Sequence, residues 1–456
     1  MRSLVELYGY DDKIERMVPS GIDERDRPQI SGEEVTVQET LDSYFPINTF
    51  LAPRVWEGAG RWFPSAPGTI EFVTGHSLSC AGRMPIISHR STLSPPGLAA
   101  MADAGVRIAE ERFAYSRREE YIDHVRALTG KSLKAVTPFW TPAEVVPSEN
   151  TWIDGELLQY LNNKSNMPQL VPRNSLPQRQ TVVGDCAEAI RTMVLPKVLK
   201  VGTNLPNGGG EDMMICRLSR HKNRAVRRFD TGEHLVIEEL LEITENYCVQ
   251  YSVRPDGSVT YLGASTQICL PNGAHAGNLL DPADQPPGPV LRLGDQIAME
   301  GGRLGFSGIA GFDIVVTQDG RVLAIDLNFR LVSSTAQVLL HPRLSRERRL
   351  AASRLAFCSY PGRLDEMLKA CRPGIDKGWL VPLATYDPAQ AEHRGTHARC
   401  RLLLFGDTPA EIAENERSLY SRGVEVAGRS ARGRTIASAA RLFKQVASRV
   451  VGPWKR

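Results

Sequence analysis

The chain has 456 residues, which is beyond the size at which a single hydrophobic core keeps growing, so two or three domains are expected. Hydrophobic residues make up 42% and charged residues 23% of the chain, which is typical of a folded protein and excludes wholesale disorder. The formal net charge of +3 is too small to indicate a nucleic-acid or membrane partner.

The eight cysteines are spread singly along the chain, with no Cys-x-x-Cys pair. Neither a zinc site nor a disulfide framework is indicated, and we expect free thiols. The first residues lack the apolar run of a signal peptide, and no segment approaches the roughly 18 apolar residues that cross a bilayer. These features predict a cytoplasmic protein.

Residues 1–175 mix short apolar runs with Pro and Gly and are predicted to form an α/β domain. Thr69–Thr74 and Ser132–Thr137 are predicted strands. Ser94–Asp103 is a predicted helix, because its prolines stand near the start, where a helix tolerates them. Apolar residues at helical spacing predict a further short helix within Trp152–Lys164.

Residues 176–345 alternate predicted strands with turns. Leu195–Val201 is a predicted strand that runs into the glycine-rich loop Gly202–Gly210, whose backbone could approach a phosphate or belong to a lid of about residues 194–240. The other predicted strands and turns of this region are His234–Leu241, Tyr247–Val253, the turn Pro255–Ser258 and Val259–Leu262.

Residues 346–456 are predicted to form a small α+β unit with a basic tail. A charged helix is expected over Arg343–Lys369, and Thr408-Pro409 opens a later helix with Glu411 in a capping box. Gly378–Ala384 and Arg401–Phe405 are predicted strands. In the tail, residues 429–456, apolar side chains on one helical stripe predict a docked terminal helix.

The sharpest chemical signal is a predicted hairpin in which two apolar strands flank Asp319-Gly320. Asp326, Asn328 and Arg330 alternate onto one face of the second strand, and Asp313 begins the neighbouring strand and can face the same side. Such oxygen ligands suit Mg²⁺ together with substrate phosphates better than they suit zinc. An arginine beside them can offset the charge of a phosphoryl group or an oxyanion.

This hairpin resembles the last core hairpin of the ATP-grasp superfamily, which carries Asp, then Glu or Asp, then Asn two residues later, often followed by Arg. The resemblance implies that Asp313 holds one Mg²⁺, Asp326 bridges two, and Asn328 completes the protein ligands. It implies that Arg330 steadies the acyl phosphate or the tetrahedral intermediate. Asp326 departs from the glutamate that is usual at the bridging position and is one methylene shorter.

Upstream segments resemble other parts of the same superfamily. Lys200 resembles the lysine before the lid that reaches the α and β phosphates of ATP, and Lys164 resembles an earlier phosphate lysine. Ile237–Asn246 resembles the linker that holds adenine, where Glu238 or Glu239 would lie near the amino group and Glu245 would accept the ribose hydroxyls. The nucleotide-binding residues that the resemblance implies are Lys164, Lys200, Gly208, Gly209, Gly210, Glu238, Glu239, Leu241 and Glu245.

The resemblance covers roughly Trp152–Leu340 and implies an ATP-grasp fold, between an amino-terminal α/β domain and a small carboxy-terminal α+β unit. It implies an enzyme that uses ATP and Mg²⁺ to activate a carboxylate as an acyl phosphate and joins it to an amine, releasing ADP and phosphate. The carboxy-terminal region is similar to the extra unit of peptide ligases of the pheganomycin type. That similarity implies a non-proteinogenic or guanidino acid as donor, a peptide as acceptor, and a role in antibiotic biosynthesis.

Other outcomes stay open at this point. They are ligation of small amino acids or of a thiol, bare phosphoryl transfer, and a nucleotide-binding protein without catalysis. Basic residues crowd Arg217–Arg228 in the expected lid and could draw in a nucleotide or an acidic peptide, or simply face water. We expect a small carboxylate donor and a peptide or amine acceptor, no nucleic-acid or membrane partner, and a homodimer as one outcome of assembly.

Overall fold

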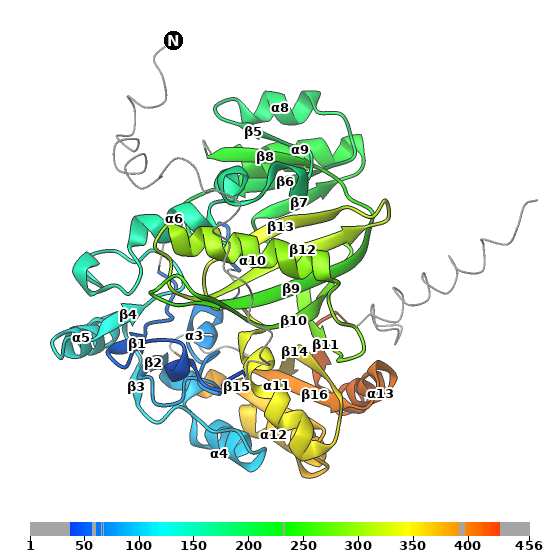
Figure 1. Ribbon diagram of the computed structural model, residues 1–456. Helices are drawn as coiled ribbons and strands as arrows, with labels where there is room; N and C mark the ends of the chain where they lie inside the picture. Colours follow the sequence, from blue (N-terminus) through cyan, green and yellow to red (C-terminus); the bar gives the residue numbers. More distant parts are fainter. Residues whose placement is uncertain are drawn as a thin grey trace, which may run out of the picture.

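The structure is a computed structural model that describes residues 37–56, 61–64, 66, 68–230, 233–391 and 397–428. In this part of the chain the strands form one nine-stranded sheet and two four-stranded sheets. Figure 1 shows the large sheet running through the middle of the molecule, with one small sheet above it and the amino-terminal domain to the lower left. The predicted class, an ATP-grasp fold with α/β and α+β regions, is confirmed.

The amino-terminal domain is built on a parallel sheet with the strand order β3-β2-β1-β4. Its two inner strands are buried along their whole length, as is usual in a parallel sheet covered on both faces. The strand predicted within Ser132–Thr137 and the helix predicted within Ser94–Asp103 are both present. The elements are β1 (Thr49–Leu51), β2 (Ile86–His89), α4 (Pro95–Asp103), β3 (Arg112–Tyr115), α5 (Arg118–Thr129) and β4 (Lys134–Val136).

The strand predicted at Thr69–Thr74 is wrong, because these residues form the helix α3 (Thr69–Val73). Gly68 precedes the helix with a φ of 75°, a left-handed conformation that glycine adopts without strain. Phe72 is the buried residue of this helical turn. A short apolar run has the same composition in a buried helical turn as in a strand, so periodicity could not separate the two.

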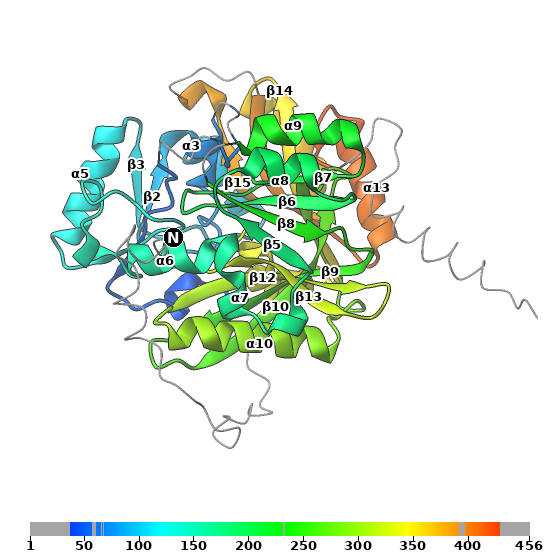
Figure 2. The same cartoon turned by 90° about the horizontal axis from the view of Figure 1, so that it is seen from above.

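The upper sheet has the order β5-β8-β6-β7, and we call it the lid sheet. Figure 2 shows the helices α8 and α9 lying together over one face of it. Apolar residues of both helices, such as Ile190 and Phe229, pack on Leu199 and Leu235 of the strands. Its elements are β5 (Arg179–Val182), α8 (Cys186–Thr192), β6 (Lys197–Gly202), β7 (Met213–Cys216), α9 (Ser219–Phe229) and β8 (His234–Glu239).

Before the lid sheet, the helix predicted within Trp152–Lys164 is present as α6 (Gly155–Asn162). Asp154 caps it, because its side chain accepts from the backbone N–H groups of Glu156 and Leu157, both at 3.0 Å. The short helix α7 (Met167–Leu170) follows. The 3₁₀ turns of the described residues are η3 (Leu41–Ser43), η4 (Arg90–Thr92), η5 (Ser148–Asn150), η6 (Lys164–Asn166), η7 (Arg173–Ser175) and η8 (Pro388–Gln390).

The first half of the large sheet contains both predicted hairpins. The turn at Pro255–Ser258 joins two eleven-residue strands, and Gly257 at this turn has a φ of 80°. One long helix covers this half of the sheet, and its Ile297 shares a core with Tyr251 and Phe312. The elements are β9 (Ile243–Val253), β10 (Val259–Cys269), β11 (His275–Leu280), α10 (Gly288–Arg303), β12 (Gly308–Thr317) and β13 (Val322–Asn328).

The carboxy-terminal strands continue the same sheet, in the order β13-β12-β9-β10-β11-β14-β16-β15, with β17 paired to β14. The strands predicted at Gly378–Ala384 and Arg401–Phe405 are therefore present, but they extend the large sheet instead of forming a sheet of their own. The domain boundaries near residues 175 and 345 stay predictions. The strands are β14 (Ala352–Pro361), β15 (Leu380–Tyr386), β16 (His397–Gly406) and β17 (Glu425–Val426).

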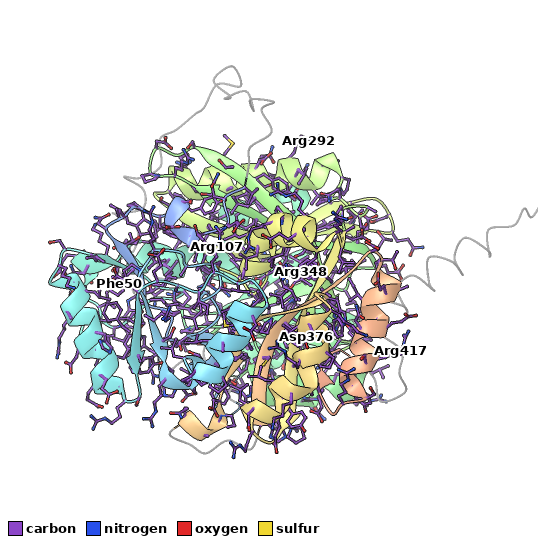
Figure 3. The ribbon with its side chains drawn as sticks, turned by 90° about the horizontal axis from the view of Figure 1, so that it is seen from below. Phe50, Arg107, Arg292, Arg348, Asp376 and Arg417 are labelled. Carbon is purple, nitrogen blue, oxygen red and sulfur yellow. The ribbon has the colours of Figure 1, made fainter. Side chains whose placement is uncertain are left out.

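The charged helix expected over Arg343–Lys369 is wrong as a continuous element. It is interrupted by β14, whose first five residues are all buried in the sheet. The basic end of α11 contacts the amino-terminal domain, where Arg348 donates to the carbonyl oxygen of Ala104; Figure 3 shows Arg348 between the two regions. The helices of this half are α11 (Thr335–Arg348), α12 (Leu364–Asp376) and α13 (Pro409–Tyr420).

Three smaller predictions can be compared with the structure. The side chain of Thr408 caps α13 by accepting from the N–H of Glu411 at 3.3 Å, while the Glu411 carboxylate accepts from Asp407 instead of Thr408. All eight cysteines are free thiols. Among the helices of the described residues, none has the length and apolar character needed to cross a bilayer. The helix predicted in residues 429–456 lies outside the described residues.

Candidate active site

One cavity of about 910 Å³ lies where the amino-terminal domain, the lid sheet and the large sheet meet. Its lining includes residues of β4, of the lid strands and of β16. Every site residue predicted from the sequence lines this cavity except Glu245. The residues thus brought together are Lys164, Lys200, Gly208, Gly209, Gly210, Glu238, Glu239, Leu241, Asp313, Asp326, Asn328 and Arg330.

The predicted hairpin is formed by the antiparallel strands β12 and β13. Asp313 stands directly opposite Asp326 in the register, so their side chains are cross-strand neighbours. Asn328 lies on the same face of β13 as Asp326, and its Nδ2 is 3.4 Å from Asp326 Oδ2. The sequence therefore predicted correctly that these three oxygen-bearing side chains gather at one place.

The two aspartates differ in their electrostatic surroundings. Burial and the neighbouring Asp326 raise the pKa of Asp313 to about 7. Burial also disfavours the charged form of Asp326, but Lys164, Lys200 and Arg330 outweigh it and hold the pKa of that carboxyl below its usual value. Asp313 Oδ1 is buried and has no hydrogen-bond partner among the described residues.

These features fit a divalent cation between the two strands. A cation would satisfy the lone oxygen of Asp313 and would offset the repulsion between Asp313 and Asp326. In the described part of the chain no group of three or more His, Cys, Asp or Glu side chains is arranged to hold a metal ion. A site of two carboxylates and one amide suits Mg²⁺, which takes much of its coordination from waters and substrate phosphates.

Lys164 begins η6 and joins two parts of the site. Its Nζ lies 2.8 Å from Asp212 Oδ2 and 2.7 Å from Asp326 Oδ1. Burial opposes its charge, yet the two carboxylates prevail and raise the pKa of Lys164 above its usual value. A permanently charged ammonium therefore lies beside the aspartate pair.

Lys200 lies in the middle of β6, where its side chain enters the cavity. Its Nζ is 2.7 Å from Glu238 Oε2 and donates to the carbonyl oxygen of Ile325 at 2.6 Å. Glu238 is buried and also lies 3.6 Å from Arg179. This hydrogen bond fixes Lys200 to β13 at the residue before Asp326. A second cation therefore lies near the carboxylates of Asp313 and Asp326.

The glycine run that follows β6 lies close to two other segments. A Cβ on Gly209 would come within 2.7 Å of Pro64 Cγ, and one on Gly210 within 3.1 Å of Ala274 Cα. Both glycines have φ values, 66° and 81°, that other residues rarely adopt. The run therefore needs glycine both for its conformation and for its close approach to Pro64 and Ala274.

The predicted adenine linker is only partly as expected. Glu239 lines the cavity, but its carboxylate is paired with Arg321, with 2.8 Å between Oε1 and Nη1. Leu241 lines the cavity. Glu245 does not, because β9 alternates its side chains and places Glu245 on the face of Tyr247, whose hydroxyl donates to it at 3.0 Å. The neighbouring Asn246 lines the cavity instead.

Arg330 follows β13 and points into the cavity. Its Nη1 donates to Asn162 Oδ1 at 2.9 Å, its Nη2 lies 3.4 Å from the carbonyl oxygen of Asn207, and its guanidinium lies over the ring of Phe139. Burial lowers the pKa of Arg330, against the opposing effect of Asp326. The side chain is held by three segments and remains next to the carboxylates.

Sequence reasoning missed Asp212, Asn162 and Asn207, which position the predicted residues. Asp212 stands two residues after Gly210, so its place after a phosphate-type loop was a usable signal. Asn162 ends α6, and its Oδ1 also accepts from the N–H of Phe329 at 3.0 Å. That contact joins residues far apart in the sequence, and no local pattern indicates it.

Two family models match this chain. Residues 177–328 match the model described as L-aspartate–L-methionine ligase, ATP grasp. Residues 40–159 match the model described as L-aspartate–L-methionine ligase N-terminal domain. Together the two matches cover more than half of the chain.

Two solved structures with the same fold illustrate how distant such matches can be in sequence. One is the ADP complex of an N5-carboxyaminoimidazole ribonucleotide synthetase, with 14% identity, a TM-score of 0.51, and coverage of 74% of this chain and 90% of that one. Another is carboxyaminoimidazole ribonucleotide synthase from Aspergillus clavatus complexed with ATP, with 11% identity, a TM-score of 0.50, and coverage of 82% and 98%. Two models of one ligase family and the shared fold place this chain in the ATP-grasp superfamily, as an ATP-dependent carboxylate–amine ligase.

Proposed function

We propose that the enzyme activates the carboxylate of an acidic amino acid as an acyl phosphate and joins it to the amino group of a second amino acid. The observation that carries the proposal is the aspartate pair of β12 and β13, which faces two buried lysines inside one cavity. Carboxylates for metal, cations for phosphate and a glycine loop are the parts that phosphoryl transfer from ATP needs.

Asp313, Asp326 and Asn328 would hold Mg²⁺ in this site. Bound there, Mg²⁺ offsets the negative charge that develops on the phosphates of ATP during transfer. Asp326 is also the partner of Lys164, so the ammonium group would lie beside the metal and the transferred phosphate. Lys200, held by Glu238, would contact the same phosphate chain as a point charge.

ATP would lie between the lid sheet and the large sheet. The backbone N–H groups of the glycine run would face its phosphates, and the linker that includes Leu241 would hold its base. Because the carboxylate of Glu239 is paired with Arg321, we assign base recognition to backbone groups of this linker. The two solved structures compared above were determined with ADP and with ATP, which supports a nucleotide in this fold.

The reaction has two steps. An oxygen of the donor carboxylate attacks the γ-phosphorus of ATP, the bond to the β,γ-bridging oxygen breaks, and ADP leaves. The amine nitrogen of the acceptor then attacks the carbonyl carbon of the acyl phosphate, releasing phosphate and a proton and forming the amide. Arg330 would stabilise the oxyanion of the second step, and its contacts with Asn162 and Phe139 in the cavity lining support this role.

The choice of substrates is supported by the description of both matching family models, which names L-aspartate and L-methionine. Cations and apolar groups share the cavity lining, which suits one acidic and one apolar partner. Arg399, Arg401, Phe72 and Phe357 all line it, and Arg401 lies over the ring of Phe357. A peptide acceptor is the alternative, since the cavity reaches from the hairpin to β16 and could admit a longer amine. The two family models and the two solved structures reported above do not name a ligase of the pheganomycin type, so that assignment stays a prediction.

The test is an assay of phosphate release over pairs of amino acids, with L-aspartate and L-methionine as the first pair and mass spectrometry to detect the dipeptide. Hydroxylamine added without the acceptor should trap the acyl phosphate as a hydroxamate. ADP formation without hydroxamate in the presence of any amino acid donor would exclude the acyl phosphate. Hydroxamate formation with a thiol as the productive acceptor would replace the amide ligase by a thioester ligase.

A further inference from the structure

Arg401 is a buried arginine in β16 whose charge is not matched by a carboxylate. Its side chain is 1% exposed, and it lines the cavity. Among the described residues no Asp or Glu forms an ion pair with it, and its Nε has no hydrogen-bond partner. Its two other nitrogens donate to backbone carbonyl oxygens, Nη1 to His76 at 3.4 Å and Nη2 to Ser333.

Two other arginines with buried side chains are paired with carboxylates. Arg354, on the adjacent strand β14, forms an ion pair with Glu416, and Arg179 lies 3.6 Å from Glu238. An unpaired buried charge is expensive, because burial removes the hydration that stabilises it. Burial lowers the pKa of Arg401 to about 10, which still leaves the guanidinium charged at neutral pH. An unpaired buried guanidinium is therefore expected at a site where a bound ligand supplies the missing negative charge.

His76 brings a second unpartnered group to the same place. Its Nε2 is buried and makes no hydrogen bond to any residue that the structure describes. Burial and the charge of Arg401 hold the pKa of His76 well below its usual value, so the ring is neutral and can offer one N–H to an anion. Arg399, two residues before Arg401 on the same face of β16, adds a second cation to the lining.

The position of this group relative to the reaction centre fits a small substrate. Arg401 Nη2 donates a hydrogen bond to the carbonyl oxygen of Ser333. Ser333 stands three residues after Arg330 in the chain. Three residues of chain span at most about 11 Å, so the Cα atoms of Arg330 and Ser333 lie within that distance. A substrate held at Arg330 by its reacting carboxylate could therefore reach Arg401 with a second carboxylate about one residue away.

We propose that Arg401 and His76 form a carboxylate-binding subsite that holds a substrate carboxylate other than the one being activated. The inference rests on the proposed function and adds the residues that select the substrate. The carboxylate could belong to the donor, as the second acid group of L-aspartate, or to the acceptor, as its α-carboxylate. In both cases the planar guanidinium fork and the imidazole N–H bind the two oxygens.

The binding test does not depend on turnover. Succinate is titrated calorimetrically into the wild-type protein and into Arg401→Gln, with MgADP present to occupy the nucleotide site. We expect the variant to bind succinate at least about tenfold more weakly, from the strength of charge-assisted hydrogen bonds, with unchanged affinity for MgADP. Equal succinate affinity in both proteins overturns the subsite.

The activity test separates the two sources of the carboxylate. One arm compares L-aspartate with L-asparagine as donor, and the other compares L-methionine with methioninamide as acceptor, in wild type and Arg401→Gln. We expect the variant to lose the preference for the acid form in one arm. Retention of both preferences overturns the subsite. If the wild type forms no amide from any pair, the proposed function fails, while the succinate titration still decides whether Arg401 binds carboxylate.

Two further variants control for folding. Arg354→Gln removes a buried arginine from the adjacent strand but leaves the cavity lining intact, and it should keep the acid preference and the succinate affinity of the wild type. If Arg401→Gln does not fold, Arg401→Lys keeps the charge and loses the planar fork. It should bind succinate several-fold more weakly than the wild type, and unchanged affinity would count against the subsite.

Discussion

Lys164 Nζ lies 2.7 Å from Asp326 Oδ1, so the segment that precedes the lid sheet and the hairpin that would hold Mg²⁺ share one buried ion pair. The same ammonium reaches Asp212, two residues after the glycine run, at 2.8 Å. One cation therefore links three segments that a nucleotide would also contact. Loss of either carboxylate should affect chemistry more than folding, because Lys164 keeps the other as a partner.

The first prediction concerns the hairpin ligands. Asp326→Ala and Asn328→Ala should each lower ADP formation by at least about 100-fold, because electrostatic stabilisation by one such group contributes that much to catalysis. Circular dichroism should report an unchanged fold. Asp319→Asn is the matched control, since it lies at the tip of the same hairpin and pairs with Arg321 outside the cavity. Near-normal turnover in both alanine variants would contradict the metal assignment.

The second prediction concerns Lys200 as a phosphate contact. Lys200→Met should weaken ATP binding about tenfold or more, the effect expected when a charged hydrogen bond is lost, and should leave acceptor binding nearly unchanged. The single variant removes the ammonium group that pairs with the buried carboxylate of Glu238. The double variant Lys200→Met with Glu238→Gln is therefore measured beside it. Lys197→Met, on the same strand and outside the cavity lining, is the control. Calorimetry that finds equal ATP affinity in the double variant would remove Lys200 from the site.

The hairpin was predictable from the sequence because its information is local. Asp319-Gly320 sets the turn, and strand alternation then places Asp313, Asp326 and Asn328 together. Glu245 was misplaced for a related reason. The spacing of the linker could not specify where β8 ends and β9 begins, and an error of one residue moves a side chain to the opposite face.

Long-range contacts explain what the sequence could not predict. Arg401 is an ordinary residue of an apolar strand until β14 and the segment that includes Ser333 surround it. The helix expected over Arg343–Lys369 failed because β14 is stabilised by its partners β11 and β16, which lie far away in the sequence. Tertiary pairing of this kind overrides local propensity.

The third prediction concerns His341, which lies on α11 with its Nδ1 2.8 Å from Ser353 Oγ and its ring stacked on Phe405. Burial lowers the pKa of His341 to about 4, whereas an unfolded histidine has a pKa near 6.5. Above about pH 6.5 the contribution of this residue to stability is complete. It falls as the pH drops from about 6.5 to about 4, because the unfolded chain binds the proton first, and the full loss is about 3 kcal/mol.

The measurement is the free energy of unfolding by denaturant at several pH values, in wild type and His341→Gln. The other buried histidines titrate in both proteins, so the difference between the two curves isolates His341. We expect the variant to be less stable at pH 7 and the gap to narrow toward pH 4. Parallel curves would show that His341 keeps an ordinary pKa in the folded protein.

The last prediction concerns the length of the acceptor. The cavity of about 910 Å³ must take the nucleotide, the donor and the acceptor, and this volume lies near the upper end of the range of about 300–1,000 Å³ that is typical of small-molecule sites. A single amino acid therefore fits the remaining space better than a peptide. With one fixed donor, kcat/KM should be highest for a free amino acid or its dipeptide and fall for longer peptides.

The acceptor series is scored by mass spectrometry for the amide product, with acceptors that share the same amino-terminal residue so that only length changes. Each remote contact that a longer acceptor gained at the transition state would raise kcat/KM, by about fivefold for 1 kcal/mol. A progressive rise with length would therefore establish a peptide acceptor, as the sequence first suggested. A decline would show that the cavity, which Arg401 and Phe357 line from β16 and β14, limits the size of the acceptor.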